Sequence, residues 1–195
     1  MIQKTENLRV KRTKILLREA LVALIEEKGF DALTVGDLTE RAMVSRAAFY
    51  RNYQDKYDLV EQIFEDAMNA LRDAVGEMGP HQHPPEVWVK FLEHIEEYER
   101  LYRALLGSRG SSWFVRKMRA SLSDMVTMHG HGHRQSAEGL VLTFLEDLVP
   151  DLVSTMLVEA ITWWLERGRS VTPREMATRC SLLMSALFKE VSTWH

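Results

Sequence analysis

The chain has little of what secreted and membrane proteins depend on. Its 195 residues include a single cysteine, Cys180. One thiol cannot form an internal disulfide, so a disulfide framework is excluded and a reducing, cytoplasmic setting is expected. The N-terminus is basic and lacks the apolar run of a signal peptide. The most apolar stretch, residues 140–164, is interrupted by Glu146, Asp147, Pro150, Asp151 and Glu159. We therefore expect no membrane span.

Motifs of the common enzyme classes are also lacking. The sequence has no glycine-rich phosphate loop, no nucleophile elbow and no helical H-E-x-x-H pair. Its serine, histidine and aspartate residues do not form a recognisable catalytic constellation. We therefore expect a protein that is not an enzyme and that binds no cofactor.

What the chain does have is helical spacing of apolar residues. Hydrophobic residues make up 46% and charged residues 27%, which is typical of a soluble globular chain long enough to bury a core. No segment alternates between polar and apolar residues as a half-buried strand would. The expected fold is all-α, with about nine helices. An N-terminal domain would span residues 1–55, and a C-terminal helical domain would span residues 56–195.

Glycine, proline and polar runs place the expected breaks between helices. Residues 107–112 (GSRGSS) and 129–136 (HGHGHRQS) are such runs, and Pro150 is expected to end a helix. Thr172 and Pro173 give a strong helix start. The expected helices are 9–28, two short helices within 34–56, then 56–77, 86–106, 113–128, 137–148, 151–167 and a last helix from Pro173.

The segment 34–56 carries the most informative pattern. Thr34 with Asp37 three residues later predicts a capping box at the start of one short helix. Ser45 is expected to begin a second by accepting a hydrogen bond from the amide of Ala47 or Ala48. Phe49 and Tyr53, four residues apart, would hold this second helix against the body of the protein.

The other side of that second helix has the chemistry of a DNA-reading surface. Arg46, Ala47, Tyr50 and Arg51 combine two cations, a phenol and a small side chain. In a major groove, arginine forks read guanine, small residues contact thymine methyl groups and hydroxyl groups hold phosphates. Lys56, at the start of the next helix, is expected to bind a further phosphate. The alternative is a helical hairpin with a solvated charged face.

A resemblance favours the DNA interpretation. The segment resembles the N-terminal domain of TetR-family transcriptional regulators over roughly the first third of the chain. The similar residues are Arg12 to Lys28 closing on Gly29-Phe30, Leu33-Thr34-Val35, Val44-Ser45, Phe49-Tyr50-Arg51-Asn52-Tyr53 and Asp55-Lys56. The resemblance implies a helix-turn-helix that binds double-stranded DNA. The implied DNA-binding residues are Thr34, Ser45, Arg46, Ala47, Ala48, Tyr50, Arg51 and Lys56.

The turn between the two short helices departs from the family pattern. The family usually has glycine or asparagine there, and this chain has Met43. If the position keeps a positive φ, a methionine costs roughly 1 kcal/mol or more in backbone strain.

Charge is distributed unevenly along the chain. The net charge is −3, yet residues 1–60 hold 11 Lys and Arg against 9 Asp and Glu. Five cations cluster before the two-helix segment, namely Lys4, Arg9, Lys11, Arg12 and Lys14. Such a segment could lie along DNA phosphates, or it could be a solvated terminus.

The last two helices have apolar faces too wide for a lone surface hairpin. In the family that this chain resembles, these helices pack against a second copy as a four-helix bundle. The resemblance therefore implies a homodimer, with packing inside one protomer as the alternative. The expected interface residues are Leu152, Met156, Trp164, Leu183, Met184 and Leu187.

The family also has an effector cavity inside its C-terminal helices, so the resemblance implies a ligand-responsive repressor. Methionine and aromatic side chains suit a small apolar or aromatic effector. The candidate lining residues are Met68, Trp88, Phe91, Trp113, Met118, Met125, Phe144 and Trp163.

Two histidine clusters raise the alternative of a metal-responsive or helical interaction protein. They comprise His81 with His83, and His129 with His131 and His133. Their spacing across glycine fixes no geometry, and no carboxylate or thiolate accompanies them. We therefore expect no metal site.

Overall fold

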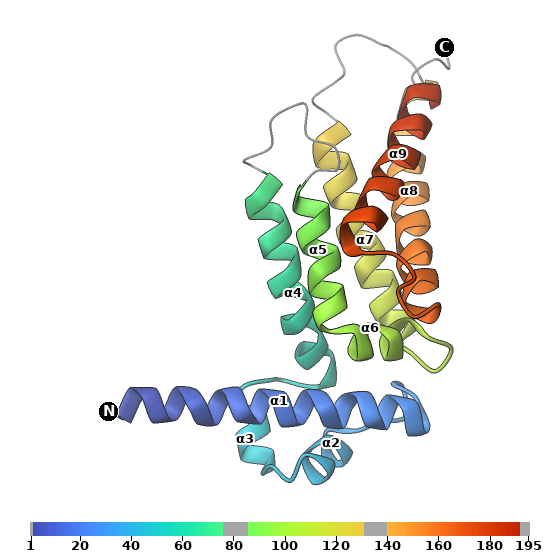
Figure 1. Ribbon diagram of the computed structural model, residues 1–195. Coiled ribbons are helices and arrows are strands. Elements are labelled where there is room, and N and C mark those ends of the chain that lie inside the picture. The colour runs from blue at the N-terminus through green and yellow to red at the C-terminus, as the bar shows by residue number, and fades with distance from the viewer. Residues whose placement is uncertain (1, 76–85, 131–139, 192–195) are drawn as a thin grey trace. The chain divides into compact units, whose positions relative to one another are not determined.

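The computed structural model describes the backbone of residues 2–75, 86–130 and 140–191, and this part of the chain is entirely helical apart from its turns (Figure 1). The predicted all-α fold is confirmed. In these ranges the helices are α1 (Ile2–Lys28), α2 (Val35–Arg41), α3 (Arg46–Tyr50), α4 (Lys56–Val75), α5 (Glu86–Glu97), α6 (Glu99–Leu106), α7 (Ser112–Gly130), α8 (Leu140–Glu166) and α9 (Pro173–Val191).

The helices form two compact units. The first comprises the chain up to Ala67 together with Tyr98–Ser111, and the second comprises Met68–Glu97 together with the chain from Ser112. These units differ from the division expected after residue 55, because the first half of α4 and the whole of α6 group with the N-terminal helices.

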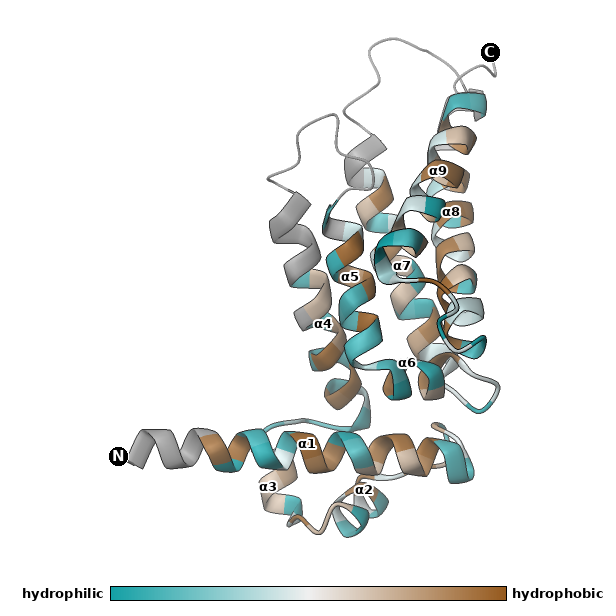
Figure 2. Cartoon of the chain, in the orientation of Figure 1, coloured by the Kyte–Doolittle hydropathy of each residue, from teal (hydrophilic) through white to brown (hydrophobic). Residues whose placement is uncertain are grey.

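The first unit is built around α1. Hydrophobic turns recur along this helix and hydrophilic turns interrupt them, as Figure 2 shows. It packs against α2 and α6, and each large side chain buried in this unit contributes roughly 1.5–3 kcal/mol. The fully or almost fully buried members of this core are Leu17, Leu21, Ile25, Phe30, Leu33, Leu38, Phe49, Leu59 and Phe64.

Helices α2 and α6 lie on opposite sides of α1 within this unit (Figure 1). Glu27 near the end of α1 pairs with Arg41 of α2. Arg18, nine residues earlier, lies over the ring of Tyr98 beside α6, with its guanidinium carbon 4.6 Å from the ring centroid. Nine residues of a helix amount to two and a half turns, so the two contacts lie on opposite faces.

Three helix boundaries differ from expectation. The expected helix 86–106 is broken at Tyr98, whose φ of −106° and ψ of 28° are not helical. The expected break at Pro150 is wrong, since α8 continues through it. Pro150 is buried, and Ser123 of α7 donates a 3.0 Å hydrogen bond to Asp151, so packing of α8 on α7 accompanies the continuous helix. Helix α1 begins at Ile2, earlier than residue 9.

The second unit packs α7 against α8 and α5 against α9. Its core contains Phe91, Ile95, Phe114, Met118, Leu122, Val153, Leu157 and Trp164. One window of α8, Leu148–Glu166, is long and apolar enough by composition to cross a membrane, contrary to the expectation from its charges. Half of that window is buried in the fold.

Candidate nucleic-acid interface

The start of α2 is fixed by local polar contacts. The amide of Asp37 donates to Oγ1 of Thr34 (3.2 Å), and the backbone N of Thr34 donates to the Asp37 carboxylate (2.7 Å). The predicted capping box is therefore confirmed. Lys28 pairs with the same carboxylate at 2.7 Å. The hydrogen bond from Lys28, followed by those from Thr34, lowers the pKa of Asp37 well below its usual range.

The turn between α2 and α3 keeps the positive φ at Met43, which is the condition under which the sequence predicts backbone strain. Met43 has a φ of 52°, and its side chain is 90% exposed. Its amide donates to the carbonyl of Glu40, and the next amide donates to Thr39. The turn thus keeps its hydrogen bonds although a methionine occupies a left-handed position, at a strain of roughly 1 kcal/mol.

Helix α3 is short and is held at both ends. Oγ of Ser45 accepts a 3.1 Å hydrogen bond from the amide of Ala48, as predicted. Nδ2 of Asn52 donates to the carbonyl of Ala48 at 2.8 Å and secures the last turn. Phe49 and Tyr53 are buried, with ring centroids 5.6 Å apart. A five-residue helix that would be unstable alone is therefore fixed in orientation by its caps and its aromatic anchors.

The opposite face of α3 is presented to solvent. Arg46, Ala47, Tyr50 and Arg51 are exposed there, and Ala48 is half-buried. Among the described residues, no ion pair involves either arginine. The Arg46 guanidinium lies beside Gly36 of α2, 3.1 Å from where a β-carbon would be. Two guanidinium groups that have no ion pair in the described part of the chain, together with a phenol on a capped helix, match the groups that read base edges and phosphates.

Lys56 has a structural role that the sequence did not reveal. Its ammonium donates to the carbonyls of Phe30 (2.9 Å), Asp31 (3.0 Å) and Leu33 (2.9 Å). An ammonium has three protons, and all three are engaged here. Burial lowers the pKa of Lys56, and the nearby carboxylates of Asp31 and Asp55 oppose that shift. This arrangement argues against the predicted phosphate contact, because no proton is left for a phosphate.

The candidate effector residues divide into several groups. Met68, Phe91, Met118 and Met125 are buried, and Trp88 and Trp113 are half-buried. Trp88 and Phe91 line an apolar pocket with Leu92, Leu157, Ile161, Ala177 and Cys180, and its volume of about 10 Å³ is at most enough for one water molecule. The side chain of Phe144 lies outside the described residues.

Two adjacent tryptophans of α8 lie in other surroundings than expected. Trp163, expected in the effector cavity, is 42% exposed, and Arg167 lies over its ring. Trp164, expected at the dimer interface, is fully buried, and its indole donates to the carbonyl of Val171 at 2.8 Å. Both assignments are corrected by the structure. Adjacent helical residues point about 100° apart, so one of the pair faces the core and the other faces solvent.

Of the other expected interface residues, Leu152 and Leu183 are exposed, whereas Met156, Met184 and Leu187 are half-buried. Sequence reasoning missed Leu182 and Phe188, which are also exposed on α9.

The two histidine clusters lie outside the part of the chain whose side chains are described. Within that part, no group of three or more histidine, cysteine or acidic residues could hold a metal ion.

Comparisons with known proteins agree with this geometry. Residues 17–63 match the family described as bacterial regulatory proteins, tetR family, and residues 82–186 match a transcriptional regulator C-terminal region. An uncharacterized HTH-type transcriptional regulator, YxbF of Bacillus subtilis (strain 168), is 27% identical over 118 residues, or 60% of this chain. The match covers 27% of that curated relative's length.

Solved structures share the fold. A TetR transcriptional regulator from Streptococcus agalactiae 2603V superposes with a TM-score of 0.60 at 21% identity, covering 93% of this chain and 98% of that one. The dihydroxyacetone kinase operon activator DhaS gives 0.56 at 15% identity, covering 91% and 96%. The second family match alone covers more than half of the chain. Together with the capped helix α3 and its exposed face, the two matches show that this protein belongs to the TetR family of transcriptional regulators, with an N-terminal helix-turn-helix that binds DNA.

Proposed function

We propose that the protein is a cytoplasmic, ligand-responsive repressor that binds a pseudo-palindromic operator as a homodimer. The observation that carries the proposal is the exposed face of α3, where Arg46 and Arg51 have no ion-pair partner among the described residues. Functionally, residues 1–55 would read DNA and residues 56–195 would regulate. Two reading helices in successive major grooves would lie ~34 Å apart on one face of the duplex.

The direct test is Arg46→Ala on an operator enriched from a random library by the wild-type protein. A bidentate arginine–guanine contact is worth ~1–3 kcal/mol, so the variant should bind about 5- to 150-fold more weakly and tolerate changes at one base pair of each half-site. Arg116→Ala, an exposed arginine of α7, is the control and should change neither property. Unchanged affinity and base preference in Arg46→Ala would assign the reading role to another surface.

Repression and activation can be distinguished by the expression of a reporter gene placed downstream of the selected operator. A repressor lowers expression, whereas an activator raises it. The fold does not decide the direction, since DhaS is named as an activator and shares it. We propose repression, and expression that increases with the protein would contradict it.

The proposed effector is a small flat apolar molecule that enters near Trp88 and Phe91, with Met118 and Met125 in the surrounding core. The pocket there is far smaller than the ~300–1,000 Å³ of typical ligand sites, so the bound state must open it. A compound found by thermal-shift screening should lower operator affinity about 5- to 150-fold, and operator DNA should weaken the compound equally. A tightly bound compound that left operator affinity unchanged would contradict the ligand response, and it would leave the proposed operator binding intact.

A further inference from the structure

Helix α1 extends well beyond the core that it helps to build. Among the residues of α1 whose side chains are described (from Leu8 on), Leu17 is the first that is fully buried, and Arg9 lies eight residues earlier, or about 12 Å along the axis. In the stretch from Leu8 to Lys14, four of seven residues are cations and none is acidic. All four, Arg9, Lys11, Arg12 and Lys14, are exposed. Among the described residues none of them has an ion pair.

The helical register divides these cations between two sides of α1. Arg9 precedes Glu27 by 18 residues, which is five full turns, so both lie on one side. That side faces α2, because Glu27 pairs with Arg41. Arg12, three residues from Arg9, is its neighbour on the helix surface.

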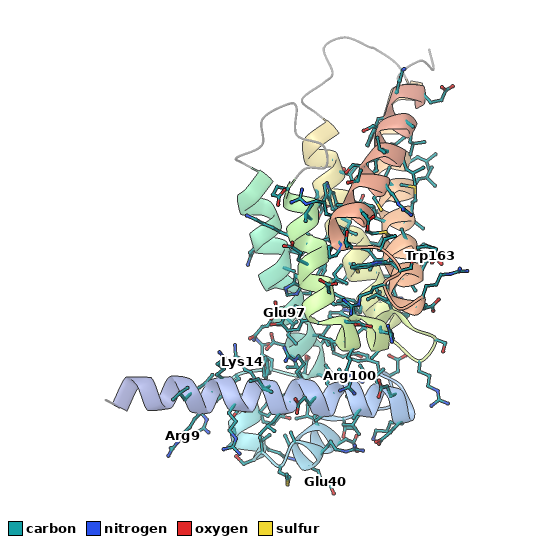
Figure 3. The ribbon with its side chains drawn as sticks, viewed as in Figure 1. Arg9, Lys14, Glu40, Glu97, Arg100 and Trp163 are labelled. Carbon is teal, nitrogen blue, oxygen red and sulfur yellow. The ribbon has the colours of Figure 1, made fainter. Side chains whose placement is uncertain are left out.

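The other two cations lie on the opposite side of α1. Lys14 and Lys11 precede Arg18 by four and seven residues, so they share its side of the helix. Arg18 lies over Tyr98 at the start of α6. Figure 3 shows the division directly, since Arg9 and Lys14 point to opposite sides of α1.

We propose that Arg9 and Arg12 form a second DNA-contacting surface, which holds backbone phosphates just outside the base pairs read by α3. This proposal rests on the proposed function. The surface is continuous with the helix-turn-helix side of α1, its charge is complementary to phosphate, and it lies beyond the edge of the three-helix core. Phosphate contacts of this kind add affinity and fix register without reading sequence.

Two charge-matched double variants test the proposal. Arg9→Gln/Arg12→Gln and Lys11→Gln/Lys14→Gln each remove two positive charges from the same stretch of helix, so any general effect of net charge is equal. Binding is measured on the selected operator within a long duplex and on the same operator trimmed to its half-sites, over a range of salt concentrations. Circular dichroism melts check that both variants remain folded.

The arginine variant should bind the long duplex at least roughly tenfold more weakly near 0.1 M salt. Its slope of log affinity against log salt should flatten by about 0.9 for each phosphate that the protein no longer neutralises. Base preference should not change, and the decrease in affinity should be smaller on the trimmed duplex. The lysine variant should resemble wild type on both duplexes.

Equal behaviour of the two variants on the long duplex would overturn the surface while leaving the reading role of α3 intact. A decrease in affinity that was equally large on the trimmed duplex would also overturn it, because the phosphates bound by the arginines would then lie within the half-sites. A wild-type protein that enriched no operator would refute the proposed function and this surface together.

Discussion

At the scale of single residues, Lys56 is a cation held by the fold on three sides. Its ammonium binds three carbonyls of the segment that follows α1 and lies 4.9 Å from the centroid of the Phe30 ring. Removing the charge leaves these carbonyls, of which those of Phe30 and Leu33 are part-buried, without the Lys56 donor. We expect Lys56→Met, which keeps the apolar stem, to lower the free energy of unfolding by about 1–3 kcal/mol, measured by urea denaturation.

Arg51→Met is the matched control for Lys56→Met. Arg51 is exposed and has no ion pair among the described residues, so its replacement should leave stability unchanged while weakening DNA binding. If Lys56→Met instead kept full stability and bound DNA more weakly, the phosphate contact predicted from the sequence would be correct.

Asp37 should make stability depend on acid pH. Its pKa in the folded state is lowered first by the hydrogen bond from Lys28 and next by those from Thr34, whereas its pKa in the unfolded state is ~4. The stabilisation is therefore complete above pH ~4 and is lost as the pH falls toward the folded value. Urea midpoints between pH 7 and pH 2.5 should fall less steeply for Asp37→Asn than for wild type. Parallel curves would show that the pair with Lys28 contributes nothing in solution.

Residue-level prediction from sequence succeeds where the interaction is local. The caps of Thr34 and Ser45 were predictable because donor and acceptor lie three residues apart, so their geometry needs no tertiary information. The roles of Trp163 and Trp164 were not. Helix α8 is apolar around much of its circumference, and such a pattern does not show which side faces the core.

At the scale of elements, tertiary packing decided what local signals could not. Tyr98 ends α5 without a glycine or proline, because Arg18 holds its ring while Leu101, Tyr102 and Leu105 of α6 are buried. Pro150 was expected to end a helix, since proline costs ~3 kcal/mol in a helix interior. Packing of α8 against α7 offsets that cost, and this packing cannot be read from the sequence alone.

The connection from α6 to α7 is held against the end of α1 within the first unit. The guanidinium of Arg109 in this connection donates to the carbonyl of Glu26 at 3.0 Å, and the backbone carbonyl of Arg109 accepts from the amide of Phe30 at 3.1 Å. Gly110 is essential to its path, because a β-carbon there would lie 2.0 Å from the carbonyl oxygen of Leu105.

We therefore expect Gly110→Ala to displace the connection and release Arg109 from α1. The overlap is with backbone, so the free energy of unfolding should fall by about 2 kcal/mol or more. Amide hydrogen exchange should quicken at Phe30. Ser108→Ala, at an exposed neighbouring position, is the control. Equal stability of the two variants would mean that the connection relaxes without strain.

At the scale of the whole molecule, the question is what covers the apolar face of α8 and α9. Leu182 and Leu183 are 62% and 60% exposed, and Leu152 of α8 is 52% exposed. Exposed apolar side chains concentrated on two neighbouring helices are typical of an interface. A second copy of the chain is the proposed partner, since two-fold symmetry would also pair two reading helices on a palindrome.

Leu183→Glu should therefore give a monomer by light scattering at micromolar concentration and weaken operator binding, because each buried leucine contributes ~1.5–3 kcal/mol in each protomer. Leu8→Glu is a matched control, since Leu8 is 62% exposed and lies on α1 in the first unit. The control should remain dimeric. If wild type were already monomeric, or if Leu183→Glu stayed dimeric with full operator affinity, α9 would not be the interface. Trp164→Ala should behave differently from both, lowering stability by about 3–5 kcal/mol, because its indole fills the core of one protomer.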